Sequence, residues 1–293
     1  MKLGFSEEFA RRVISEITPF QHLSGTEHVA PLLYSLIRML KPQTVVEFGS
    51  GYTTPYILQA LKDNEEDFKF NQRVLRERAA RNFAALGQAS RASMQPEDWL
   101  IDPTTQEIYG QEPVVPIPSF YARPYRPQLH TFEVLPDNDA YVSRLSGLVR
   151  DLNLDGLFSL HAGCRVTDYV SRLPAERLPI DFAWNDFGNK KRFFDETFQH
   201  VRADGGVMAF HNTTSSEKDH KADLDQVFEG LRPLLQTRQA ELLTFLEPHK
   251  FTQRSLTVVR KVVDFEQEFY HDLTGEYDLS LLKLSRARGD ILA

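Results

Sequence analysis

Only one cysteine, Cys164, occurs among the 293 residues of the sequence, so no disulfide bond can form within the chain. A single thiol fits a reducing compartment. The sequence also lacks a long basic run: 34 lysine and arginine residues stand against 41 aspartate and glutamate residues, and the net charge is −7. This balance argues against a nucleic-acid-binding surface.

Long apolar stretches are missing as well. No run approaches the roughly 20 residues that a membrane-spanning helix needs. Residues 1–16 are amphipathic and charged, without the apolar region of a signal peptide. These absences predict a soluble cytoplasmic protein that binds neither nucleic acid nor a membrane.

Short apolar runs alternate with amphipathic segments along most of the chain. Strands are expected at residues 43–48, 130–134, 156–161, 180–185, 207–210, 241–246 and 256–261, and helices at 6–17, 27–40, 55–64, 68–86, 139–152, 167–173, 190–201 and 223–235. This alternation predicts an α/β fold with a seven-stranded, mostly parallel sheet, helices on both faces and an antiparallel closing edge. Ligands bind at the carboxyl ends of the strands in such sheets.

An insertion interrupts the alternation between the first and second strands. Residues 87–127 are rich in proline and aromatic residues, and a structureless loop of that length is improbable inside a compact domain. We expect N-terminal helices at 1–42, an α/β core at 43–62 and 129–263, an inserted cap at 63–128 and a tail at 264–293. The alternative for the insertion is an arm that assembles a homodimer.

Two glycines follow the first expected strand, in the order Glu47-Phe48-Gly49-Ser50-Gly51-Tyr52-Thr53-Thr54. Glycine lets a backbone approach a nucleotide-like ligand closely, because it has no Cβ. Thr53 or Thr54 is expected to cap the helix that follows. This strand, turn and helix resemble motif I of the class I methyltransferases that depend on S-adenosyl-L-methionine (SAM). A tight turn without a ligand is the alternative.

Polar residues also follow the other expected strands, whose carboxyl ends should lie at the same edge of the sheet. Glu133 ends the second strand, where a carboxylate can accept hydrogen bonds from both hydroxyls of a ribose. Three stretches resemble the catechol-type O-methyltransferases of that family, namely residues 131–137, 180–186 and 202–212. The resemblance implies a Rossmann-like class I methyltransferase fold and methyl transfer from SAM to the oxygen or nitrogen of a small metabolite.

The resemblance also implies roles for individual residues. Glu47 and Gly49 would lie near the methionine part of SAM, Gly51 beneath its ribose and Glu133 on the ribose hydroxyls. The further residues expected at the cofactor are Tyr52, Gly163, Cys164 and Asp186, with Gly163 and Cys164 at the adenine. The residues expected at the substrate are Trp99, Tyr109, Tyr121 and Trp184, since aromatic faces also favour a sulfonium cation.

Asp186, His211 and Asn212 correspond to the metal ligands of the metal-dependent branch, with His211 in place of an aspartate. An imidazole would favour Mn²⁺, Fe²⁺ or Zn²⁺ over Mg²⁺. His211 as a metal-free general base, assisted by Asp186, is a second interpretation. Residues with a purely structural role are a third.

Three other functions remain open from the sequence. A nicotinamide-dependent oxidoreductase also uses a glycine turn and a second-strand acid, but the chain contains no Tyr-x-x-x-Lys pair. A SAM-binding protein without catalysis is another possibility. The third is an enzyme that attacks the aminocarboxypropyl arm of SAM, as in an intramolecular cyclisation, and would need the same cofactor site.

Overall fold

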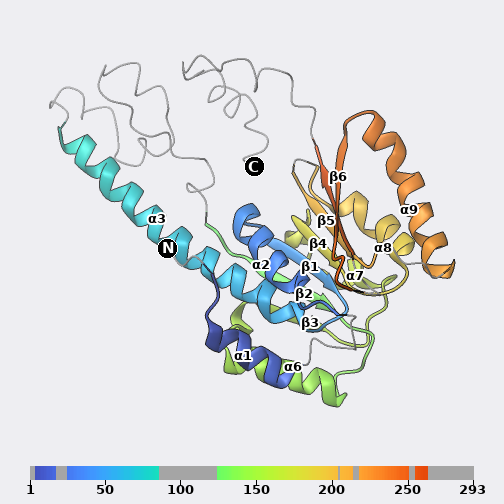
Figure 1. Cartoon of the computed structure of the whole chain (residues 1–293). Coiled ribbons are helices and arrows are strands. Elements are labelled where there is room, and N and C mark those ends of the chain that lie inside the picture. The colour runs from blue at the N-terminus through green and yellow to red at the C-terminus, as the bar shows by residue number, and fades with distance from the viewer. Residues whose placement is uncertain are drawn as a thin grey trace. The chain divides into compact units, whose positions relative to one another are not determined.

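The computed structural model contains a seven-stranded sheet and describes residues 4–17, 25–85, 124–203, 205–213, 218–250 and 255–262 (Figure 1). The strand order is β3-β2-β1-β4-β5-β7-β6. The strands are β1 (Thr44–Phe48), β2 (Gln128–Phe132), β3 (Phe158–His161), β4 (Phe182–Asn185), β5 (Val207–His211), β6 (Ala240–Leu246) and β7 (Ser255–Lys261). The helices are α1 (Glu7–Glu16), α2 (Val29–Leu40), α3 (Thr53–Ala85), α6 (Ala140–Asp151), α7 (Tyr169–Arg172), α8 (Lys190–Thr197) and α9 (Lys218–Gln236).

The first five strands pair in parallel, and β7 is antiparallel to both β5 and β6. The predicted mixed sheet with its antiparallel closing edge is therefore confirmed. The register aligns Phe48 with Phe132 and with Asn185, and Asn185 with Phe210. The residues that follow β1, β2, β4 and β5 consequently meet at one side of the sheet, which we call the carboxyl edge.

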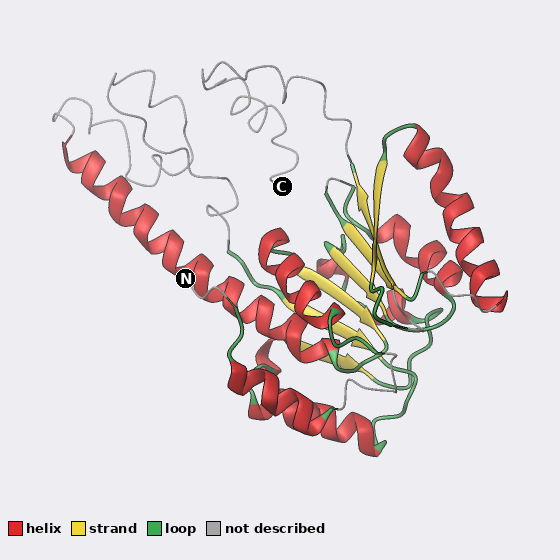
Figure 2. Cartoon of the chain, in the orientation of Figure 1, coloured by secondary structure: helices red, strands yellow, loops and turns green. Residues whose placement is uncertain are grey.

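Alternate side chains of the central strands enter two separate apolar clusters. Val45 packs with α1, α2, α3 and α6, whereas its neighbour Val46 packs with α7, α8 and α9. Trp184 and Ala183 divide between the two clusters in the same way. Helices therefore cover both faces (Figure 2), as expected for a parallel sheet whose strands are apolar on both sides.

Polar side chains fix the starts of two helices. Ser6 accepts a hydrogen bond from the backbone N–H of Phe9 at α1, and Asp139 accepts one from Tyr141 at α6. Thr53 and Thr54 differ from the prediction, because they form the first turn of α3 and their hydroxyls donate to Glu47. They fasten the helix to β1 and do not precede it as a cap.

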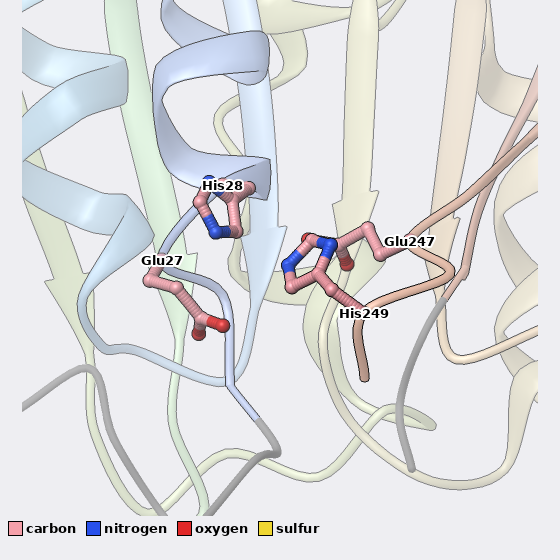
Figure 3. Close-up of side chains that lie close together, drawn as sticks. All are labelled: Glu27, His28, Glu247 and His249. Carbon is pink, nitrogen blue, oxygen red and sulfur yellow. The ribbon is translucent and has the colours of Figure 1, made fainter. Parts of the chain in front are cut away.

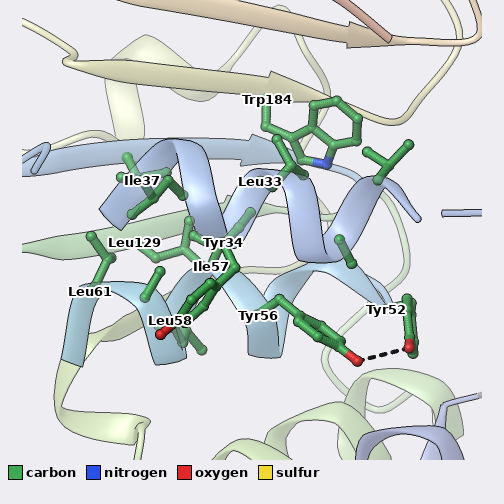
Figure 4. Packing of buried hydrophobic residues seen from close by; sticks show 14 of the residues in the cluster. Leu33, Tyr34, Ile37, Tyr52, Tyr56, Ile57, Leu58, Leu61, Leu129 and Trp184 are labelled. Carbon is green, nitrogen blue, oxygen red and sulfur yellow. Dashed lines mark hydrogen bonds between the residues drawn. The ribbon is translucent and has the colours of Figure 1, made fainter. Parts of the chain in front are cut away.

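The predicted break near Asn64 is wrong, because α3 runs without interruption from Thr53 to Ala85. Asp63 and Asn64 are buried and bind α2: Tyr34 Oη donates to Asp63 Oδ2 at 2.6 Å, and Asn64 Nδ2 donates to Ile37 O at 2.8 Å. Leu33 of α2 and Leu58 of α3 pack in the same interface (Figure 4).

The chain divides into two compact units, residues 1–65 with 126–264 and residues 66–125 with 265–293. In the second unit, the described part consists of the end of α3 and residues 124–125, where the rings of Phe68 and Tyr125 lie 5.6 Å apart. Residues 86–123, which hold most of the expected cap, lie outside the described residues. The role of this insertion stays a prediction.

None of the described helices is both long and apolar enough to cross a membrane.

Candidate functional site

The glycine turn after β1 fits closely between its neighbours at the carboxyl edge. Gly49 has a φ of +84°, which side chains with a Cβ rarely adopt, and its N–H donates to Phe132 O at 3.0 Å. A Cβ on Gly51 would lie 3.3 Å from the hydroxyl of Tyr141. The two glycines therefore let the turn lie against both β2 and α6.

The carboxylate of Glu47 lies beneath this turn and accepts hydrogen bonds from three hydroxyls. Thr53 donates to Oε1 at 2.7 Å, and Thr54 and Thr131 donate to Oε2 at 2.7 and 2.8 Å. Burial raises the pKa of Glu47 to about 7; the hydroxyls oppose this shift and the nearby charge of Asp186 adds to it. Glu47 was expected to contact a cofactor, but it has no exposed surface. It instead joins β1, β2 and α3.

Glu133 follows β2 and faces the same turn. Its Oε2 accepts hydrogen bonds from the N–H of Ser50 at 2.9 Å and from the hydroxyl of Ser50 at 2.7 Å. Its Oε1 accepts one from the N–H of Leu135 at 3.1 Å. A single carboxylate oxygen thus takes two adjacent donors from the glycine turn.

Tyr141 of α6 is a residue of this site that the sequence analysis missed. Its hydroxyl donates to Ser50 O at 3.2 Å. Burial raises the pKa of Tyr141, and the charges of Glu47, Glu133 and Asp186 raise it further. Three carboxylates therefore lie close enough to act on one hydroxyl. The only signal in the sequence is its position two residues after Asp139, the cap of α6.

Asp186 and His211 form a pair at the ends of β4 and β5. Nδ1 of His211 lies 2.7 Å from Oδ1 of Asp186. The imidazole is buried, with 2% of its side chain exposed, whereas 28% of the Asp186 side chain is exposed. Asp186 also donates its N–H to Phe48 O, which connects the pair to the glycine turn.

Asn212 follows His211 in the left-handed conformation, with a φ of +54°. Its N–H donates to Ser255 O at the start of β7, at 2.7 Å. The structure therefore places all three candidate metal ligands, Asp186, His211 and Asn212, in one part of the carboxyl edge.

Gly163 and Cys164 lie beside the segment that follows β2. Gly163 donates its N–H to Leu135 O at 2.8 Å, and Cys164 donates its N–H to Glu133 O at 2.9 Å. The Cys164 side chain is buried, and burial raises the pKa of its thiol, so a nucleophilic role is not favoured. These backbone contacts bring both residues to the carboxyl edge, as expected.

Two aromatic residues that we expected at the ligand are buried in the apolar core. Trp184 has no exposed surface, and its indole N–H donates to Thr53 Oγ1 at 3.3 Å. The expected substrate contact of Trp184 therefore does not fit this structure. Tyr52 is 7% exposed and its hydroxyl lies 2.9 Å from that of Tyr56. The other expected substrate residues, Trp99, Tyr109 and Tyr121, lie outside the described residues.

Comparisons with known proteins identify the fold. No family model and no curated protein matches the sequence. The O-methyltransferase TomG from Streptomyces achromogenes, which is involved in tomaymycin synthesis and was crystallised with SAM, is similar over 88% of this chain and 91% of its own, with a TM-score of 0.54 and 12% identity. The methyltransferase PaMTH1 from Podospora anserina, crystallised with S-adenosylhomocysteine, is similar over 89% of this chain and 90% of its own, with a TM-score of 0.50 and 10% identity. The chain shares the fold of these methyltransferases.

Proposed function

We propose that the protein transfers a methyl group from SAM to the oxygen or nitrogen of a small metabolite. The observation that carries the proposal is the meeting of the glycine turn with two acidic residues at the carboxyl edge: Glu133 accepts hydrogen bonds from Ser50, and the N–H of Asp186 donates to Phe48 O. SAM carries a sulfonium and an ammonium group, and opposite charge favours their binding in a partly buried site. The shared fold with SAM-bound methyltransferases supports the same ligand.

The residues at the carboxyl edge suit the parts of this cofactor. Glu133 already accepts two adjacent donors from Ser50 through one oxygen, and the two hydroxyls of a ribose would offer a similar pair. Gly49 and Gly51 would bring the backbone close to the ligand, and Gly163 and Cys164 would lie at its adenine. Glu47 would act through the turn that it holds, without touching the ligand.

When bound, SAM supplies a methyl group on a positively charged sulfur. The chain must align an acceptor with that carbon and remove the acceptor's proton. We assign to His211 the role of removing the acceptor's proton. Asp186 accepts a hydrogen bond from the Nδ1–H of His211, and this fixes the tautomer in which Nε2 is the basic nitrogen.

A metal ion bound by Asp186, His211 and Asn212 fits the geometry less well. Two ligand atoms at about 2.1 Å from one ion and at right angles lie about 3 Å apart. The 2.7 Å between His211 Nδ1 and Asp186 Oδ1 is shorter, and it is the length of a direct charge-assisted hydrogen bond.

The other reactions are distinguishable from methyl transfer. Dinucleotide-binding sheets have the order 3-2-1-4-5-6 in parallel, whereas here an antiparallel β7 separates β5 from β6. Attack on the aminocarboxypropyl arm would use the same residues. Its product would be methylthioadenosine, and methyl transfer would give S-adenosylhomocysteine, so mass spectrometry of the nucleoside product separates the two.

Calorimetry with S-adenosylhomocysteine tests the cofactor assignment. Replacing Glu133 by alanine should weaken binding by about 2–4 kcal/mol, because hydrogen bonds to a charged acceptor are lost. Glu176→Ala removes an exposed carboxylate outside the carboxyl edge and serves as the matched control. Equal affinity in wild type and a folded Glu133→Ala variant would overturn the assignment, and competition by NADH would favour the oxidoreductase.

A further inference from the structure

Two histidines and two glutamates converge outside the site described above. Glu27 and His28 lie directly before α2, and Glu247 and His249 lie in the loop after β6 (Figure 3). One ligand atom from each residue lies within 4.8 Å of the others. The rings of His28 and His249 meet edge to face, with their centroids 4.7 Å apart.

The distances lie close to those of a metal site. A tetrahedral ion with ligands at about 2.0–2.2 Å holds its ligand atoms about 3.3–3.6 Å apart. The ligand atoms would therefore need to approach one another by up to about 1.5 Å, which is within the reach of side-chain rotations at a surface. Both histidines are exposed and both glutamates are partly buried, so the imidazoles can move while the carboxylates stay in place.

One carboxylate oxygen in the cluster has unused binding capacity. Oε2 of Glu27 is buried and has no hydrogen-bond partner among the residues that the structure describes. A buried polar atom of this kind is costly unless another group binds it. The atom belongs to one of the four candidate ligands, which is an observation independent of the spacing.

Lys250 neutralises part of the negative charge of the two carboxylates. Its ammonium, on a side chain that is 1% exposed, lies 3.1 Å from Glu27 Oε1 and 2.9 Å from Glu247 Oε1, and it donates to Gly25 O at 2.7 Å. One lysine balances one of the two carboxylates, so the group of five side chains keeps one negative charge when both imidazoles are neutral. Lys250 also holds the carboxylates side by side.

We propose that Glu27, His28, Glu247 and His249 bind a divalent transition-metal ion of the zinc class, with Lys250 positioning the two carboxylates. Two imidazole nitrogens and two carboxylate oxygens suit Zn²⁺ and its neighbours, whereas Mg²⁺ and Ca²⁺ prefer oxygen ligands alone. Four protein ligands leave no open position, as in a structural site. The ion would join the start of α2 to the β6–β7 loop, two segments far apart in the chain.

Cobalt provides a direct test, because four-coordinate Co²⁺ with nitrogen and oxygen ligands absorbs strongly in the visible range. Untagged full-length protein is stripped with a chelator and titrated with Co²⁺, and the bound Co²⁺ is then displaced with Zn²⁺. We expect one equivalent of tetrahedral Co²⁺. His28→Ala and His249→Ala should each weaken binding by more than about tenfold, because each removes one ligand.

The controls separate this cluster from other metal-binding residues. His200→Ala removes a histidine outside both sites and should keep the full equivalent. The double variant Asp186→Asn/His211→Ala should also keep it, and loss of the metal in that variant alone would assign the ion to the carboxyl edge and overturn the proposal.

Two further outcomes would also overturn the proposal. The first is that the wild-type protein binds no stoichiometric Co²⁺ or Zn²⁺ whereas the Lys250→Met variant does. The ammonium of Lys250 would then occupy the place of the metal ion between the carboxylates. The other is equal Co²⁺ affinity in wild type, His28→Ala and His249→Ala. Stoichiometry and absorption do not depend on methyl transfer, so these results are independent of the proposed function.

Discussion

The carboxylate of Glu47 shows how one buried acid can organise a ligand site without being exposed to it. Burial favours its protonated form, while hydroxyls from Thr53, Thr54 and Thr131 stabilise the charged form. The balance leaves the pKa of Glu47 at about 7, above its usual value of 4.5. The unfavourable free energy of charging this carboxylate therefore exists only in the folded state. It can be measured as a pH dependence of the free energy of unfolding.

The stability of the wild-type protein should therefore fall relative to Glu47→Gln as the pH rises from 4.5 to about 7. The folded state holds a proton on Glu47 in this range and the unfolded state does not, so the contribution is fully present below pH 4.5 and lost near pH 7. The difference in unfolding free energy should change by up to about 3 kcal/mol, as measured by urea unfolding at several pH values. A difference independent of pH would contradict the assigned pKa.

The Asp186–His211 pair leads to a prediction about catalysis. His211→Ala should lower kcat by roughly 10²–10⁴-fold with little change in S-adenosylhomocysteine affinity, because a general base acts in the transition state. His200→Ala is the matched control.

Chelators distinguish the remaining interpretations of His211. Loss of activity with a chelator and its restoration by a divalent ion, if both also occur in an active His28→Ala/His249→Ala variant that lacks the other candidate metal site, would favour a metal at the carboxyl edge. A near-normal rate in His211→Ala without chelator sensitivity would leave His211 with a structural role.

At the scale of elements, the sequence predicted what depends on local periodicity. Val45 and Val46 enter opposite clusters because strand side chains alternate, and the strand ends followed from the same pattern. The continuity of α3 was missed although residues 56–85 contain neither glycine nor proline. The polar pair Asp63-Asn64 indicated an end, but its partners, Tyr34 and Ile37, lie in α2 and depend on tertiary packing.

The residues of the candidate site also divide into those that local sequence patterns predict and those that depend on tertiary packing. Glu133, Asp186 and His211 were predictable because each lies at the end of a strand or directly after it, at the carboxyl edge. Tyr141 was not, because its contact with Ser50 depends on how α6 packs on the sheet. The cluster of Glu27, His28, Glu247 and His249 combines two segments whose proximity no local pattern reveals.

At the scale of the whole molecule, the residues proposed for the cofactor and those proposed for the acceptor belong to different units. Gly49, Glu133 and His211 lie in the unit of residues 1–65 and 126–264, whereas Trp99, Tyr109 and Tyr121 belong to the other. Binding of S-adenosylhomocysteine and turnover of an acceptor are therefore expected to respond separately to substitutions. This separation can test whether the insertion is a cap or an assembly arm.

The combined variant Trp99→Ala/Tyr109→Ala/Tyr121→Ala should lower kcat/KM for the acceptor by at least about tenfold, because aromatic contacts that orient the acceptor contribute more than about 1.4 kcal/mol together. Its calorimetric affinity for S-adenosylhomocysteine should stay within a few-fold of wild type. The acceptor is first identified by mass-spectrometric screening of phenols and amines. Phe70→Ala, which removes an exposed ring from α3 in the same unit, is the control. If sedimentation instead shows a dimer becoming a monomer with kcat/KM retained, the insertion serves assembly, and the acceptor contacts must come from residues of the first unit.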